Sequence, residues 1–269
     1  MRHAKLILTF VLFLAVGLAF SQADFSRLEL SGVKPEAIYA DLYGNIYAIQ
    51  DFQFTKFGAD GHFICSYGDF KLGHITSADV TNPQKIMLFY KESGIILFLD
   101  EHLAPITAPA DLFKANFLRI SAVAYSTSNI IWLYDESNSD LIRTDFQLNQ
   151  KDIIHQQTRN INPLQLFEIQ EKTVVLNAGR DGLFFFDSFG TLIKNLPIAT
   201  ENPVQIINDK IFYLKDNQLH EYDSKMLDEK VYDIGKGNIR QLLITQGNII
   251  ILTQNGECFS ASLHSFQNN

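Results

Sequence analysis

The residues of this chain that could do chemistry are acidic and basic side chains next to short apolar runs. Carboxylate, imidazole and guanidinium groups can bind a polar ligand, hold a metal ion or transfer a proton. The main binding candidates are Asp51, His74, Asp135, Asp140, Arg180 and Asp181. Secondary candidates are Glu92 and Asp216 in turns like those of the main candidates. Asp41, Asp79, Arg119 and Arg240 are further candidates, which we expect together at one end of the central channel. We therefore expect these side chains at the ends of structural elements.

No sequence motif joins these residues into a catalytic site. The chain has no Gly-x-Ser-x-Gly elbow, no histidine pair spaced as zinc ligands and no phosphate-binding loop. The segment DESNSD at 135–140 is similar to a calcium loop, but it lacks the central Gly and the closing Glu. The same residue types are also typical of a solvated turn. We therefore predict no catalytic residue, no metal and no cofactor.

The elements that must position these residues are six apolar strands that recur along the chain. They lie at 45–50, 85–90, 129–134, 172–177, 210–215 and 248–253, with starts 38 to 44 residues apart. Each is followed by a short polar tip and a second apolar run, the pattern of an antiparallel hairpin. Further strand-like runs lie upstream of each hairpin and downstream of most. Residues 108–119 are the one segment in which we expect a short helix.

Four strands at a period of about 40 residues match the dimensions of a propeller blade. The predicted fold is therefore all-β, a six-bladed propeller of four-stranded antiparallel blades. The last unit lacks a fourth strand, and residues 25–31 belong to no other unit. We expect that N-terminal segment to complete the sixth blade and close the ring. A β-sandwich with extra sheets is the alternative, which the even repeat disfavours.

The first residues have the layout of a secretory signal peptide. A basic start with Arg2 and Lys5 precedes an apolar run at 6–20, and Ala19 and Ser21 fit a cleavage site after Ser21. We expect a leader at 1–21 and one propeller domain at 22–269, with an uncleaved membrane anchor as the alternative. The mature protein would be exported, not membrane-spanning, and either periplasmic or secreted. An exported protein could join Cys65 to Cys258, or it could keep both as buried free thiols.

The charge of the chain bounds its partners. The net charge is −8, and it becomes −10 once Arg2 and Lys5 leave with the leader. Because an acidic protein repels phosphate backbones, nucleic acid is excluded as a partner class. On its own, the protein is expected to be a monomer.

Two segments resemble known families. The pattern Asp-x-x-Gly-Asn-Ile-Tyr at 41–47, followed by KFGADG at 56–61, resembles blades of NHL-type six-bladed propellers. Residues 72–103 are similar to a group of exported propeller proteins of Bacteroidota-type bacteria. That resemblance extends to the periplasmic plug subunit of the type 9 secretion translocon. It implies a periplasmic protein whose partner is an outer-membrane translocon.

The expected function is a non-catalytic protein-interaction module. A propeller hydrolase or lactonase with a metal at the channel mouth is one alternative, and Glu36 and Asn208 would be residues of that site. A small-ligand or glycan binder is the other, with Tyr67, Phe70 and Phe113 as aromatic platforms. An exposed apolar patch on one rim would favour the interaction module.

Overall fold

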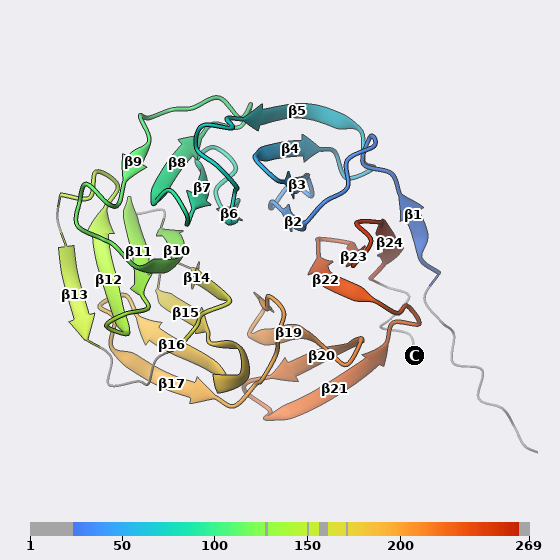
Figure 1. Cartoon of the computed structure of the whole chain (residues 1–269). Coiled ribbons are helices and arrows are strands. Elements are labelled where there is room, and N and C mark those ends of the chain that lie inside the picture. Colours follow the sequence, from blue (N-terminus) through green and yellow to red (C-terminus); the bar gives the residue numbers. More distant parts are fainter. Residues whose placement is uncertain (1–23, 127–128, 150, 156–160, 171, 264–269) are drawn as a thin grey trace, which may run out of the picture.

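The computed structural model describes residues 24–126, 129–149, 151–155, 161–170 and 172–263. The predicted leader at 1–21 lies outside them. These residues form twenty-four strands in six four-stranded antiparallel sheets, arranged as a ring (Figure 1). Helical structure within the described residues is one 3-10 turn, η1 (Gly179–Asp181). No helix in this part of the chain has the length and apolar character to cross a membrane.

The first three blades follow one another along the chain, each running from its innermost to its outermost strand. Blade 1 contains β2 (Ala37–Ala40), β3 (Ile46–Gln50), β4 (Gln53–Phe57) and β5 (Phe63–Gly68). Blade 2 contains β6 (Ser77–Asp79), β7 (Ile86–Tyr90), β8 (Ile95–Leu99) and β9 (Ala110–Asp111). Blade 3 contains β10 (Ile120–Ser126), β11 (Ile130–Asp135), β12 (Asp140–Asp145) and β13 (Lys151–His155).

The remaining blades complete the ring. Blade 4 contains β14 (Gln165–Ile169), β15 (Thr173–Asn177), β16 (Leu183–Asp187) and β17 (Leu192–Leu196). Blade 5 contains β18 (Gln205–Ile207), β19 (Lys210–Lys215), β20 (Gln218–Asp223) and β21 (Asp228–Asp233). Blade 6 contains β22 (Ile239–Ile244), β23 (Asn248–Thr253), β24 (Cys258–Ser262) and β1 (Ser26–Leu28).

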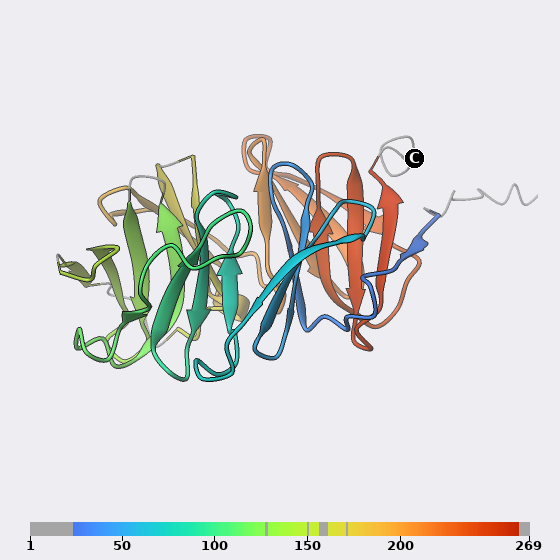
Figure 2. The same ribbon diagram turned by 90° about the horizontal axis from the view of Figure 1, so that it is seen from above.

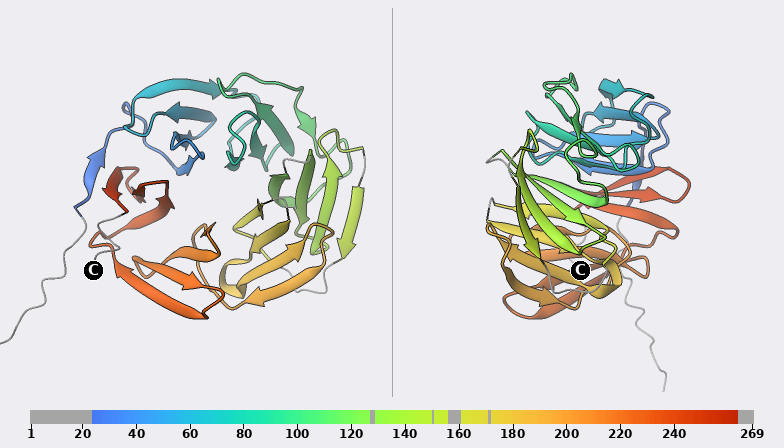
Figure 3. Two further views of the ribbon diagram at one scale, coloured as in Figure 1. Left: turned by 180° about the vertical axis from the view of Figure 1, so that it is seen from behind. Right: turned by 60° about the vertical axis from the view of Figure 1, so that its left-hand side comes forward.

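The ring is closed by the N-terminal strand, as the sequence predicted. β1 pairs antiparallel with β24, and Leu28 lies opposite Cys258. The two ends of the described chain therefore lie beside each other in blade 6, which Figure 3 shows from behind. Both cysteines are free thiols, so the bridge considered above is not formed. Burial raises the pKa of the Cys258 thiol to about 11.

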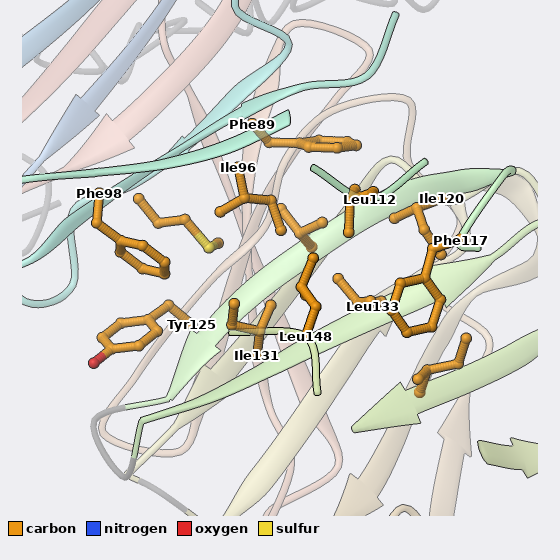
Figure 4. Packing of buried hydrophobic residues seen from close by; sticks show 13 residues of the cluster. Phe89, Ile96, Phe98, Leu112, Phe117, Ile120, Tyr125, Ile131, Leu133 and Leu148 are labelled. Atoms are coloured by element: carbon orange, nitrogen blue, oxygen red, sulfur yellow. The ribbon is translucent and has the colours of Figure 1, made fainter. Parts of the chain in front are cut away.

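The core consists of apolar clusters, one at each boundary between neighbouring blades. The middle strands read as continuous apolar runs because a neighbouring blade covers each of their faces. β7, for example, is buried along its whole length. Figure 4 shows the cluster between blades 2 and 3, where Phe89 and Phe98 of blade 2 meet Tyr125 and Leu133 of blade 3.

Side-chain amides add polar links between inner strands. The Gln241 amide accepts a hydrogen bond from the N–H of Ile38 (3.0 Å) and donates one to its carbonyl (2.7 Å). Gln205 makes the same pair of bonds to Ile244, at 2.6 and 3.0 Å. Each glutamine therefore acts as a backbone-like connection where two sheets meet without pairing.

The outermost strands show how the ring avoids edge-to-edge pairing. β1 and β9 are short, with three and two residues. β13 and β21 carry charged residues and run in regular register. β5 and β17 carry less charge, and each has a register shift against its neighbour. Short length, charge or a bulge thus protects each edge.

The helix expected at 108–119 is wrong. Residues 110–111 are the short outer strand β9, and 112–119 form a compact loop. Asn116 has a positive φ of 64°, and the N–H of Phe117 donates to Leu112, five residues earlier, at 2.8 Å. Neither feature fits an α-helix, in which the bond spans four residues.

Candidate functional site

The ring has two ends, which we call the front rim and the back rim. Figure 2 shows the ring edge-on, with strands running between them. The front rim holds the loops that lead from one blade to the next and the turns between second and third strands. The back rim holds the turns between first and second strands and between third and fourth strands.

The six predicted site residues all lie at the front rim. Asp51, Asp135, Asp140, Arg180 and Asp181 belong to turns between second and third strands or to their ends, and His74 belongs to the loop between blades 1 and 2. The secondary candidates Glu92, Arg119, Asp216 and Arg240 share this rim. Asp41 and Asp79 do not, because they come at the far end of inner strands. The expectation that those two join Arg119 and Arg240 is therefore wrong.

Glu36 and His74 form a hydrogen-bonded pair at the front rim. The His74 Nε2 lies 2.7 Å from the Glu36 Oε2, and both side chains are half exposed. The N–H of Asp51 donates to the other Glu36 oxygen at 3.3 Å. Arg240 of blade 6 donates to the Glu36 carbonyl at 3.4 Å. An imidazole and a carboxylate in contact with solvent can exchange a proton or bind a polar ligand.

A second charged group lies at the boundary of blades 2 and 3. One Glu136 oxygen accepts hydrogen bonds from the Arg119 guanidinium, the shorter at 2.8 Å, and the other accepts one from the Lys91 ammonium at 3.1 Å. The hydrogen bond from Arg119, and then that from Lys91, hold the pKa of Glu136 below its ordinary value. Two cations on one carboxylate leave this group with a net positive charge.

The other predicted residues do not converge. Asp135 accepts hydrogen bonds from Ser137 and Asn138 within its own turn. Asp140 is buried. Arg180 pairs with Glu201 in the loop toward blade 5, and Asp181 is exposed on η1.

The structure does not assemble the metal site considered above. Glu36 precedes an inner strand at the front rim, whereas Asn208 follows β18 toward the back rim. Across the described residues, no three His, Cys, Asp or Glu side chains gather in a way that could hold a metal ion. The charged residues on the inner strands are Asp79, Glu168 and Arg240. Asp79 accepts bonds from the N–H groups of Thr81 and Tyr125.

The back rim repeats one turn in four blades. The carboxylate of an aspartate accepts hydrogen bonds from the backbone N–H groups two and four residues later. The backbone carbonyl of the same aspartate accepts a third bond, from the N–H three residues later. These aspartates are Asp41, Asp100, Asp145 and Asp187. The third residue has positive φ and is Gly44, Leu103, Leu148 or Gly190. The turn first seen as Asp-x-x-Gly is therefore kept where the glycine is replaced by leucine.

Exposed apolar side chains lie on the loops that contact the turn at 91–94 of blade 2. Phe113 covers Gly94, since a Cβ there would lie 2.7 Å from its ring, and the Leu112 N–H donates to the Gly94 carbonyl. On the other side, the Ser93 hydroxyl donates to the Leu72 carbonyl, which ties the loop carrying Phe70 to the same turn. Phe70, Phe113 and Leu118 are all exposed.

We call this group the blade 2 surface: Phe70, Phe113 and Leu118 with Lys91, Arg119 and Glu136. Among the aromatic residues suggested for a glycan platform, Phe70 and Phe113 belong to it, whereas Tyr67 packs partly buried against the cluster between blades 1 and 2. Sequence reasoning missed Lys91, Leu118 and Glu136. Their signal was weak, because the ion pair of Lys91 with Glu136 joins two blades and Leu118 belongs to a loop that the sequence did not predict.

Comparisons with known proteins reveal similarity in fold but not in sequence. No protein-family model matches the chain, and no curated protein matches its sequence. A solved structure of a streptogramin B lyase is 11% identical, with a TM-score of 0.59, over 91% of this chain and 89% of that one. The virginiamycin B lyase of Staphylococcus aureus is 10% identical, with a TM-score of 0.59, over 90% and 89%.

A third similar structure is the WD40 domain of Neurospora crassa Pan2. It is 10% identical, with a TM-score of 0.57, over 90% of this chain and 96% of that one. At these identities the likeness concerns the fold alone. The matches support the propeller and do not support the finer resemblance to NHL-type propellers or to the secretion plug. The chain is therefore similar in fold to these β-propellers.

Proposed function

We propose that the protein is an exported, non-catalytic propeller that binds a protein partner through the blade 2 surface. The observation that carries the proposal is the group of exposed Phe70, Phe113 and Leu118 next to paired charges on loops that the fold holds in place. Apolar anchors surrounded by polar groups are typical of protein interfaces, and large aromatic side chains dominate their binding energy.

The expected location of the protein follows from the predicted leader at the start of the chain. The expected class of its partner follows from the family resemblance of residues 72–103. A leader at 1–21 would deliver the protein through the inner membrane. The similarity of residues 72–103 to exported propellers of Bacteroidota-type bacteria, extended to the plug subunit of the type 9 secretion translocon, favours a periplasmic protein. Its partner would then be the periplasmic end of an outer-membrane pore.

The test is affinity purification of the tagged mature protein from gently solubilised envelopes of its source. The wild type should recover an outer-membrane protein in near-equal amount. The double variant Phe113→Ser with Leu118→Ser should lose it. A matched control, Met226→Ser on an exposed back-rim turn, should retain it. Recovery of the wild-type protein alone would contradict a stable partner, and full retention by the double variant would place the interface elsewhere.

A second candidate function, a hydrolase or lyase, is favoured by the Glu36–His74 pair. Half-exposed imidazole and carboxylate groups at 2.7 Å are a workable acid and base. The test is a screen of lactones and glycans with the wild type and with Glu36→Gln. Turnover that disappears in the variant would support an enzyme, and turnover by neither protein would remove this candidate.

A further inference from the structure

The loop at 112–119, between β9 and β10, is firmly anchored at the boundary of blades 2 and 3. Leu112 and Phe117 are buried in the apolar cluster of that boundary, and Figure 4 shows both side chains in it. The Phe117 N–H donates to the Leu112 carbonyl at 2.8 Å and closes the loop at its base. The Lys151 ammonium lies 4.7 Å from the centre of the Phe117 ring. A loop held in this way can present side chains without being ordered on binding.

The residues next to the two anchors point the other way. Phe113 follows Leu112 and Leu118 follows Phe117, and both are exposed. Because the loop is closed at 112 and 117, these two side chains leave the backbone from neighbouring positions. They form a pair of apolar anchors on one small element.

The charges on this loop favour an acidic ligand. Lys114 and Arg119 are its charged side chains, and they are 85% and 64% exposed. Their carboxylate partners Asp111 and Glu136 lie deeper, at 24% and 22%. The loop therefore presents cations outward in a chain whose net charge is −8. Glu92, on the neighbouring turn, is an exposed acid at this boundary.

We propose that the loop at 112–119 binds an acidic segment of the partner that carries apolar or aromatic anchors. Carboxylates of the segment accept hydrogen bonds from Lys114 and Arg119, and its apolar side chains pack on Phe113 and Leu118. This inference rests on the proposed function, because it names the chemistry of the partner for the same surface.

The experiment uses a random peptide library displayed on phage and panned against the immobilised mature protein. The enriched peptides should combine Asp or Glu with Leu or aromatic residues. Their affinity, measured by fluorescence anisotropy, should fall about tenfold or more in the double variant Phe113→Ser with Leu118→Ser. It should also weaken as salt is raised, and Glu92→Gln should strengthen it.

Charge reversal is the decisive arm. Panning against Lys114→Glu with Arg119→Glu should enrich basic peptides in place of acidic ones, whereas Lys225→Glu on the back rim should leave the acidic selection unchanged. Thermal melting checks that each variant is folded. Enrichment without acidic residues, no enrichment, or an unchanged selection after charge reversal would overturn the inference. The proposed function stands if envelopes still yield a partner, and it fails separately if they do not.

Discussion

The two rims of the ring differ in how closely the blades resemble one another. At the back rim, four blades repeat one aspartate turn with the same hydrogen bonds. At the front rim three charged groups differ in composition: Glu36 meets His74, Glu136 meets Arg119 and Lys91, and Arg180 meets Glu201. Repeated polar residues in this fold therefore serve the blades, and the residues that occur once are the candidates for function.

The strongest test of this contrast is an aspartate at each rim. The buried Asp41 accepts bonds from two backbone N–H groups, the Asn45 amide and the Tyr47 hydroxyl. Asp41→Ala leaves these donors without a partner, and we expect unfolding to become easier by about 3 kcal/mol in denaturant titrations. Asp181→Ala, at the exposed front rim, should change stability by less than about 0.5 kcal/mol. Equal losses would remove the distinction.

Leu148 tests the back-rim turn more finely. It is buried, yet its φ is 61°, a region that suits glycine better than leucine. Leu148→Ala should cost about 2 kcal/mol through lost burial. Leu148→Gly loses the same contacts, but glycine adopts a positive φ without strain. The Gly variant should therefore be more stable than the Ala variant by about 1 kcal/mol. The usual order, with Ala more stable than Gly, would contradict the assignment.

Gly94 tests how the Phe113 ring packs at the front rim. Its φ is 65°, and a Cβ would lie 2.7 Å from the Phe113 ring. Gly94→Ala should cost about 1–2 kcal/mol and move Phe113. Gly73→Ala is the matched control, since it has a φ of 88° and open space around a Cβ. We expect Gly94→Ala to lose more stability than Gly73→Ala and to bind the acidic peptides more weakly. Equal stability and equal binding of the two variants would contradict the contact between Gly94 and Phe113.

The smallest expected effect is the pH dependence of Glu136. Its pKa is lowered in the folded protein, so its ion pairs stabilise the fold above the ordinary glutamate pKa, and this stabilisation is lost as the pH falls through the lowered value. Glu136→Gln should therefore be less stable than the wild type at pH 7, by less than about 1 kcal/mol. The difference should vanish in acid. A constant difference across the titration would show that charge is not its cause.

Much of the fold could be predicted because a blade is a local repeat. The second strands, such as β7 and β23, can be found as apolar runs of regular spacing. The closing strand β1 can be found because its segment belongs to none of the six repeat units. The loop at 112–119 could not be predicted, since its anchors Leu112 and Phe117 bind a cluster made by two blades. The separation of Asp41 from Arg119 was missed although chain order carries it: Asp41 follows the first strand of its blade, whereas Arg119 precedes one.

The ion pairs of the front rim were also hidden from the sequence. Glu136 and Glu201 lie 17 and 21 residues from the arginines they contact, in loops whose paths depend on neighbouring blades. The positions of the six predicted site residues on one rim followed from topology alone. Their partners followed from tertiary structure.

The most direct test of the central claim is site-specific photocrosslinking in intact envelopes. A benzoylphenylalanine at position 118 replaces a leucine that is 66% exposed at the front rim, and one at position 226 replaces a methionine that is 79% exposed at the back rim. If the front rim binds the partner, position 118 should give a single protein adduct and position 226 should not. An adduct from 226 alone, or none from 118, would contradict the account.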